Sequence, residues 1–370
     1  MGGRRHGILI AGGGTAGHTL PAVAIAQALV ARGRAPGEIH FVGSRRGSEA
    51  RLVPEAGFAI TLLPGRGVQR RMTAANLGAI AGLSVALVRA VGLVGRRRPA
   101  VVVAMGGYAS LACVLAAVLW RVPLVVAEQN AVAGAANRVA ARFAKACSVA
   151  FPGTGLPRAV LTGNPVRAEI AAVDRDAGRA VARQAIGADE GRPVVFVFGG
   201  SLGARRINEA VVDVASRWAD DPRVTFRHVI GERDWDLARP AALESAGSGY
   251  QPVRYERDMA TALTAADLVV SRAGATTVAE VAAVGVGAVF VPLPIATADH
   301  QTANAQALVD AQAAIVVPDA AFDGDRLEAE LGRLLDDPDA LQSMAAAAAR
   351  LGRPDAADRV AEVVEEHARA

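Results

Sequence analysis

Aromatic residues make up only 4% of this 370-residue chain, and it has only two cysteines, Cys113 and Cys147. The scarcity of aromatic side chains argues against a single-stranded nucleic-acid binder, because such proteins stack bases on aromatic rings. The two cysteines show neither metal-ligand nor redox spacing. We therefore expect two buried, reduced thiols in a cytosolic protein.

The sequence also lacks an uninterrupted apolar run long enough to cross a bilayer. Its longest apolar regions, 77–95 and 111–127, are broken by Arg89 and by Arg121-Val122-Pro123, whereas a transmembrane helix needs about 20 apolar residues. The opening MGGRRHG leads directly into a predicted strand and does not resemble an export signal. We expect a chain that is neither exported nor membrane-spanning.

Aliphatic and basic residues, by contrast, are abundant. Hydrophobic residues make up 52% of the chain, enough at this length to fill two cores. The formal charge is +4 and the isoelectric point is about 9.6. Without aromatic platforms, this basic character favours phosphate ligands or an anionic lipid surface.

The first motif is "ILIAGGGTAGHTLPAVAIAQAL". An apolar run at 8–11 predicts a buried strand, and the apolar spacing of 21–29 predicts a helix. Gly12, Gly14 and Gly17 between them form G-x-G-x-x-G, a turn that lets a phosphate approach a helix N-terminus. Alone, the pattern equally suits a turn that packs tightly against its helix.

A dinucleotide site is one interpretation of this turn. NAD binding favours an acid after the second strand, and NADP binding favours basic residues there. The predicted strand 39–42 is followed by Gly43-Ser44-Arg45-Arg46. An NADP-dependent oxidoreductase is therefore an alternative function.

A second strand-turn-helix motif is predicted in "RPVVFVFGGSLGARRINEAV". Apolar runs predict strands ending at Ala11, Val42, Met105 and Ala127 in the first half, and near Phe198, Ile230, Val270 and Val291 in the second. Polar segments follow these ends, where ligands bind in open α/β sheets. We predict an α/β protein with two Rossmann-like lobes facing a cleft: 1–165, 166–345 after the linker "GNPVRAEI", and a C-terminal helix in 346–370, starting near Asp355, that packs back on the first lobe.

Several motifs, in order along nearly the whole chain, resemble the MurG family. They are "GGGTAGHTLPAVAIAQAL", "MGGYAS", "AEQNAVAGAANR", "GNPVR", "FGGSLGARRIN", "SRAGATTVAEVAAVGVGAVFVPLP" and "DHQTANAQALVDAQAA". The resemblance implies a glycosyltransferase-B fold and transfer of N-acetylglucosamine from UDP-N-acetylglucosamine to lipid I, undecaprenyl-pyrophosphoryl-N-acetylmuramoyl-pentapeptide. It implies no cofactor and a peripheral location on the cytoplasmic face of the plasma membrane. Another glycosyltransferase-B acceptor, or a noncatalytic sugar-nucleotide binder, remains an alternative.

The resemblance also implies site residues. Donor-binding positions are Thr15, Ala16, Gly17, Asn130, Arg167, Ser201, Glu256, Met259, Gly274, Ala275, Thr276, Thr277, Glu280 and Gln301, and acceptor-binding positions are Gly14, Gly106, Gly107 and Tyr108. Glu280 would accept hydrogen bonds from the ribose hydroxyls. Ala127 stands where many members carry a histidine.

The implied reaction is an inverting displacement in which the acceptor C4 hydroxyl attacks the anomeric carbon. His18 and Glu128 are the candidate bases, because a sugar hydroxyl is a poor nucleophile at neutral pH. Helix N-termini can stabilise the departing UDP, so we expect no metal site. The Asp-x-Asp pairs at 174–176, 234–236, 323–325 and 337–339 follow no predicted strand end and are interpreted as surface or turn acids.

Two local features complete the expectations. Residues 70–98 carry apolar residues at helical spacing between basic ends, which predicts a membrane-facing patch or a core-packed crossover helix; the residues are Leu77, Ile80, Leu87, Val91 and Val94, with Arg70, Arg71, Arg96, Arg97 and Arg98. Asn130 is expected to cap the helix that runs through Arg142 as well as serve the site.

Overall fold

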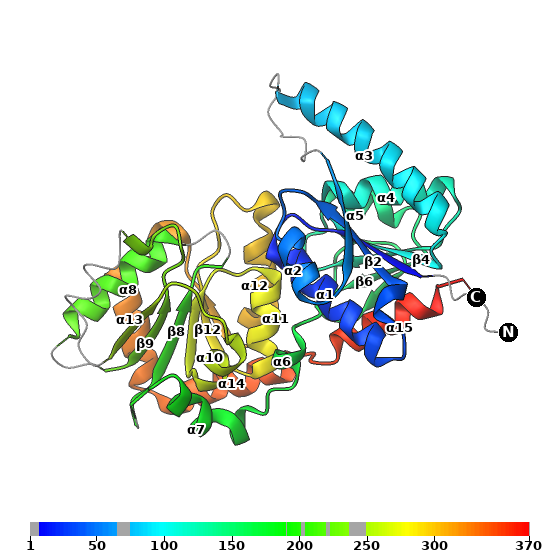
Figure 1. Cartoon of the computed structure of the whole chain (residues 1–370). Helices are drawn as coiled ribbons and strands as arrows, with labels where there is room; N and C mark the ends of the chain where they lie inside the picture. The colour runs from blue at the N-terminus through cyan, green and yellow to red at the C-terminus, as the bar shows by residue number, and fades with distance from the viewer. Residues whose placement is uncertain are drawn as a thin grey trace. The chain divides into compact units, whose positions relative to one another are not determined.

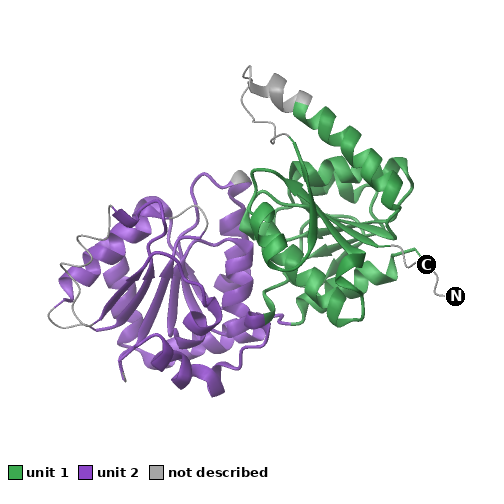
Figure 2. Cartoon of the chain, viewed as in Figure 1, with its two compact units in different colours: residues 1–168, 355–370 green, residues 169–354 purple. Residues whose placement is uncertain are grey.

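The computed structural model describes residues 7–64, 75–189, 191–200, 204–219, 223–236 and 249–369, without the side chains of 75–81 and Thr297. Ser201, Arg70 and Arg71 lie outside the described residues. The chain divides into two compact units (Figure 2). Unit 1 comprises residues 1–168 and 355–370, and unit 2 comprises residues 169–354.

Unit 1 is built on a parallel seven-stranded sheet in the order β3-β2-β1-β4-β5-β6-β7. The strands are β1 (Ile8–Gly12), β2 (Ile39–Ser44), β3 (Ala59–Leu63), β4 (Val101–Gly106), β5 (Leu124–Glu128), β6 (Ala146–Val149) and β7 (Ala159–Leu161). The central strand β4 is buried at every position. Helices cover both faces, which is why its sequence is apolar without alternation.

Two helical layers enclose this sheet (Figure 1). One layer contains α3 (Ala75–Arg97), α4 (Gly107–Leu119) and α5 (Ala135–Ala141). The other contains α1 (Ala16–Ala31), α2 (Glu49–Glu55) and α15 (Ala356–Glu366).

The C-terminal helix α15 completes the core of unit 1. Asp355 is its N-cap residue, and Val360 and Val364 are buried with the β1 and α1 side chains. Arg32 and Arg34, which follow α1, pair with Glu365 at 2.8 and 3.4 Å. The boundary expected at residue 345 falls inside α14 (Pro338–Leu351), and unit 2 ends at Pro354.

Unit 2 repeats the plan with a parallel six-stranded sheet in the order β10-β9-β8-β11-β12-β13. Its strands are β8 (Val194–Phe198), β9 (Thr225–Val229), β10 (Tyr250–Val253), β11 (Leu268–Ser271), β12 (Gly287–Phe290) and β13 (Ala314–Val316). Its helices are α6 (Ala168–Ala171), α7 (Arg175–Ala185), α8 (Arg205–Arg217), α10 (Met259–Ala265), α11 (Ala275–Val284), α12 (His300–Asp310), α13 (Gly324–Leu335) and α14.

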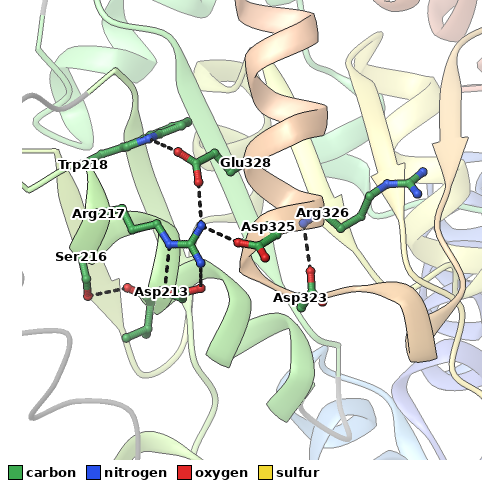
Figure 3. Close-up of polar contacts among 9 residues, drawn as sticks. Asp213, Ser216, Arg217, Trp218, Asp323, Asp325, Arg326 and Glu328 are labelled. Atoms are coloured by element: carbon green, nitrogen blue, oxygen red, sulfur yellow. Dashed lines mark hydrogen bonds and ion pairs between the residues drawn. The ribbon is translucent and has the colours of Figure 1, made fainter.

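An ion-pair network joins α8 to α13 on the surface of unit 2 (Figure 3). The Arg217 guanidinium contacts Asp213 on its own helix and Asp325 and Glu328 on α13. Its hydrogen bonds to Asp325, Glu328 and Asp213 raise the Arg217 pKa above its ordinary value. Trp218 Nε1 donates to Glu328 across the same junction, and buried Val211, Val214, Leu327 and Leu331 of the two helices belong to one core.

The predicted fold class is confirmed in both units. Each predicted strand ends within one or two residues of the observed end, and each sheet has the Rossmann order with a crossover beside its first strand. Cys113 and Cys147 are buried and unpaired, and burial raises their pKa to about 12 and about 11. In the described part of the chain, no helix has the length and apolar character needed to span a membrane.

Candidate functional site

Three loops of unit 1 meet at the carboxyl ends of β1, β4 and β5. A Cβ atom on Gly107 would lie 2.9 Å from the carbonyl oxygen of Gly13, so only glycine allows the β1 and β4 loops to approach this closely. A Cβ on Gly106 would lie 3.5 Å from both His18 Nε2 and Asn137 Nδ2. Gly106 thus marks the point where side chains of α1 and α5 converge.

His18 lies in the first turn of α1 and is partly exposed. Its Nδ1 lies 3.3 Å from Thr15 Oγ1, and its backbone N–H donates to the Thr15 carbonyl. In the tautomer whose Nδ1–H donates to Thr15, the Nε2 atom next to Gly106 carries the lone pair. The Gly14-to-Gly17 segment therefore sets the position of the imidazole.

Glu128 ends β5 and is only 3% exposed. Its carboxylate accepts hydrogen bonds from the backbone N–H groups of Asn130 (3.0 Å) and Gly134 (2.9 Å), and from Asn137 Nδ2 (2.9 Å). These contacts shape the loop between β5 and α5. The N-cap residue of α5 is Gly134, so the predicted capping role of Asn130 is wrong: its N–H groups are directed to Glu128 instead.

Tyr108, a predicted acceptor residue, follows Gly106 and Gly107 at the start of α4. Its hydroxyl lies 3.0 Å from the carbonyl oxygens of both Leu63 and Pro64, and it can donate to either. Burial raises the Tyr108 pKa, and the nearby Glu49 carboxylate adds to the shift. The hydroxyl thus ties the β4 loop to the end of β3.

The first glycine turn already contains an acid. Glu49 is 2% exposed, and its carboxylate accepts hydrogen bonds from Gly14 N (2.8 Å) and Ser44 N (2.7 Å). The Gly14 amide is therefore bonded to a carboxylate of the chain itself. From the sequence, an acid was looked for directly after β2, where the chain has Arg45 and Arg46, and both are exposed. The acid that binds the turn, Glu49, is the first residue of the next helix, α2.

In unit 2, the predicted donor residues lie at the carboxyl ends of β10, β11 and β12. Gly274 is the N-cap residue of α11 and offers no side chain to its first turn, Ala275 to Thr277. Glu280 lies further along the same helix and is 4% exposed. A helix N-terminus without a side-chain cap is suited to an anionic ligand.

Two further donor positions are held by specific contacts. Glu256 pairs with Arg227 at 2.8 Å and accepts from the backbone N–H of Asp258, just before Met259 begins α10. Gln301 Oε1 accepts from the backbone N–H of Leu293, so Gln301 fixes the loop after β12. Arg167 is partly exposed near the end of unit 1.

Sequence reasoning missed Arg272, which follows β11 and is almost fully buried. Its guanidinium donates to the carbonyls of Val291 and Pro292 and to Asp319. These contacts connect the loops after β11 and β12. Its only sequence signal was an arginine inside an otherwise apolar and small-residue segment.

The Asp-x-Asp pairs have structural roles. Asp174, Asp323 and Asp337 accept N–H bonds as N-caps of α7, α13 and α14. Asp234 lies in a turn, as one of the two predicted roles has it, but it is buried and accepts from Asn208 and Arg205. Within the described ranges, no three His, Cys, Asp or Glu side chains lie close enough to hold a metal ion.

Two protein-family models match this chain, one in each half of the sequence. The glycosyltransferase family 28 N-terminal domain matches residues 8–149, and the glycosyltransferase family 28 C-terminal domain matches residues 194–360. A crystal structure of Acinetobacter baumannii MurG superposes with a TM-score of 0.75 and 29% identity, covering 97% of this chain and 98% of that one.

Curated relatives carry a more specific name. The protein from Cutibacterium acnes is 42% identical over 360 residues, covering 96% of this chain and 95% of its own length. The protein from Alkalilimnicola ehrlichii is 44% identical over 365 residues, covering 98% and 99%. Both are named UDP-N-acetylglucosamine--N-acetylmuramyl-(pentapeptide) pyrophosphoryl-undecaprenol N-acetylglucosamine transferase. The chain therefore belongs to the MurG family of N-acetylglucosamine transferases, within glycosyltransferase family 28.

Proposed function

We propose that this chain transfers N-acetylglucosamine from UDP-N-acetylglucosamine to the C4 hydroxyl of lipid I, with inversion at the anomeric carbon. The observation that carries this proposal is identity of 42% and 44%, over nearly the whole chain, to relatives named for this transfer. The lipid substrate would be met at the cytoplasmic face of the plasma membrane. The product would be lipid II, a precursor of peptidoglycan.

Unit 2 supplies the donor site in this proposal. The N-terminal turn of α11 faces the UDP diphosphate, and its aligned N–H groups stabilise the charge that grows as UDP departs. Glu280 accepts from the ribose hydroxyls, and the segment from Glu256 to Met259 borders the uracil. Gln301 contacts the sugar hydroxyls, and Ser201 contacts the phosphate. Arg167, which belongs to unit 1, is a further proposed donor residue.

Unit 1 supplies the acceptor site and the base. Glu128 already accepts N–H bonds from the loop that follows it, which suits a residue that positions the acceptor loop. His18 is partly exposed at the meeting point of the β1 and β4 loops. We therefore assign His18 as the base that takes the C4 hydroxyl proton, and Glu128 as its support.

The membrane contact in this proposal comes from α3 and α4. The central part of α3 is core-packed, since Ala86, Ala90 and Val94 are buried, which agrees with the crossover-helix alternative. The exposed apolar residues of the two helices are instead Val85 and Val88 on α3, and Leu115, Val118 and Leu119 on α4, followed by Trp120. Exposed Arg96, Arg97 and Arg98 lie beside them, and Arg98 stacks on Trp120.

The NADP alternative loses its main support. Glu49 already occupies the Gly14 amide that a pyrophosphate would use, and a second anion beside it would be repelled. Calorimetric titration with UDP and with NADPH separates the two functions: binding of UDP alone supports the transferase. A turnover assay with UDP-N-acetylglucosamine and a lipid I analogue then excludes a noncatalytic binder; binding without turnover would reject our proposal.

A further inference from the structure

The Glu49 carboxylate is enclosed by glycine. A Cβ atom built on Gly13, Gly43 or Gly47 would overlap the Glu49 side chain. The carboxylate bridges two loops, because one oxygen accepts from Gly14 after β1 and the other accepts from Ser44 at the end of β2. It therefore fills the inside of the turn in which nucleotide-binding folds hold a phosphate.

A second contact joins the same two loops. Thr19 Oγ1, in α1, lies 2.9 Å from Ser48 Oγ and donates to the Thr15 carbonyl at 3.1 Å. Thr15 in turn pairs with His18 through its hydroxyl and its carbonyl. A continuous set of contacts thus runs from Glu49 through the glycine turn to the His18 imidazole.

We propose that Glu49 is a positioning residue for His18, and that its carboxylate substitutes for a phosphate inside the first glycine turn. This inference rests on the proposed role of His18 in the transfer reaction. A buried carboxylate is suited to the task because both of its oxygens accept, one from Gly14 in the turn and the other from Ser44 at the end of β2.

The test compares Glu49→Gln with Glu49→Ala. Glutamine keeps the shape but must direct its NH₂ group toward one of the two backbone donors, so one bond is lost and two donors are opposed. We expect kcat to fall by about tenfold or more, with donor KM changed by less than about twofold, because a charged hydrogen bond is lost near His18 and not in unit 2. Glu55→Gln is the matched control: Glu55 is exposed on the same helix α2 and pairs only with Arg51 among the contacts described.

Acetate provides a rescue that a merely misfolded variant would not show. In Glu49→Ala the vacated carboxylate site can take a small anion, so added acetate should raise kcat in a saturable way, while chloride at equal ionic strength should not. A wild-type kcat in Glu49→Gln, or equal effects of acetate and chloride on Glu49→Ala, would overturn the proposal.

Hydrogen exchange requires no sugar transfer, so it tests the Glu49 contact independently of the proposed transferase activity. Hydrogen exchange of residues 12–20 and 43–48 should become faster in Glu49→Gln while exchange of α11 is unchanged. If the wild-type chain transfers no sugar but these segments still loosen, the proposed function fails and the loop contact stands. If turnover is normal and exchange is unchanged in Glu49→Gln, the positioning role fails.

Discussion

At the residue scale, the two buried acids that the structure describes in unit 1, Glu49 and Glu128, accept hydrogen bonds from backbone N–H groups. Glu49 and Glu128 are both almost fully buried; Glu49 joins the ends of β1 and β2, and Glu128 holds the loop between β5 and α5. Holding a loop this way uses the lone pairs that a general base needs. The partly exposed His18 is the remaining candidate that lies where the β1 and β4 loops meet.

The roles of these residues separate in a pH profile. His18→Ala should lower kcat by about 10²- to 10⁴-fold, the usual contribution of a positioned base, with little change in donor KM. The acidic limb of the kcat profile should vanish in His18→Ala and persist in Glu128→Gln. An acidic limb that survives in His18→Ala and disappears in Glu128→Gln would make Glu128 the base.

Glu280 is the residue proposed to bind the ribose hydroxyls of the donor. Glu280→Ala should raise the donor KM and weaken UDP binding by about 10- to 150-fold, because a hydrogen bond to a charged group contributes about 1.5–3 kcal/mol. Glu209→Ala is the control, because Glu209 is an exposed acid on α8 of the same unit. An unchanged donor KM in Glu280→Ala would show that the ribose lies elsewhere.

At the element scale, α3 and α4 present a basic rim beside exposed apolar side chains. Changing Arg96, Arg97 and Arg98 together to Ser should weaken binding to anionic vesicles by about two orders of magnitude, since each basic residue near such a surface adds about 1 kcal/mol. Binding to neutral vesicles should change little.

The control for this surface is in unit 2. Arg333, Arg350 and Arg353 are exposed there, and changing all three to Ser alters the net charge by the same amount. If both triple variants lose vesicle binding equally, net charge and not the α3 rim attracts the membrane.

A buried histidine makes the β9–β10 region sensitive to acid. His228 is fully buried between the Tyr250 hydroxyl (2.7 Å) and Asn208 Oδ1 (3.0 Å), and burial lowers its pKa from 6.5 to about 3. The unfolded chain therefore binds a proton more readily than the folded one, so stability is lost as pH falls from about 6.5 towards 3. Urea midpoints measured across this range should decline less steeply in His228→Gln; parallel declines would contradict the role of His228.

At the scale of the whole molecule, the chain leaves unit 1, builds unit 2 and returns to finish the first core with α15. Val364→Ala should lower the free energy of unfolding of unit 1 by about 2 kcal/mol, from lost burial and the cavity left behind. Hydrogen exchange of β1 and β4 should report the loss, with β8 unaffected. Glu362→Ala, which removes an exposed ion pair with Arg32, should cost at most about 1 kcal/mol; equal effects would mean that α15 contributes little core.

Local signals in the sequence were sufficient for the architecture. Buried parallel strands are apolar without interruption, and the glycine turns and helical spacing that follow them are short-range patterns, so both units and the main strand ends could be predicted. The short strands β3, β6, β7, β10 and β13 were not predicted, because neighbours in the sheet determine whether a short segment becomes a strand.

The sequence by itself thus determined the fold class, the family and the positions that follow each strand. Only the tertiary structure decided which side chains meet there. Glu49 reaches Gly14 across 35 residues, Asn208 reaches His228 across 20, and Glu365 reaches Arg32 across 333. Such contacts depend on strand order and on the register of parallel pairing, which bring distant residues together, and no local pattern of residue types records them.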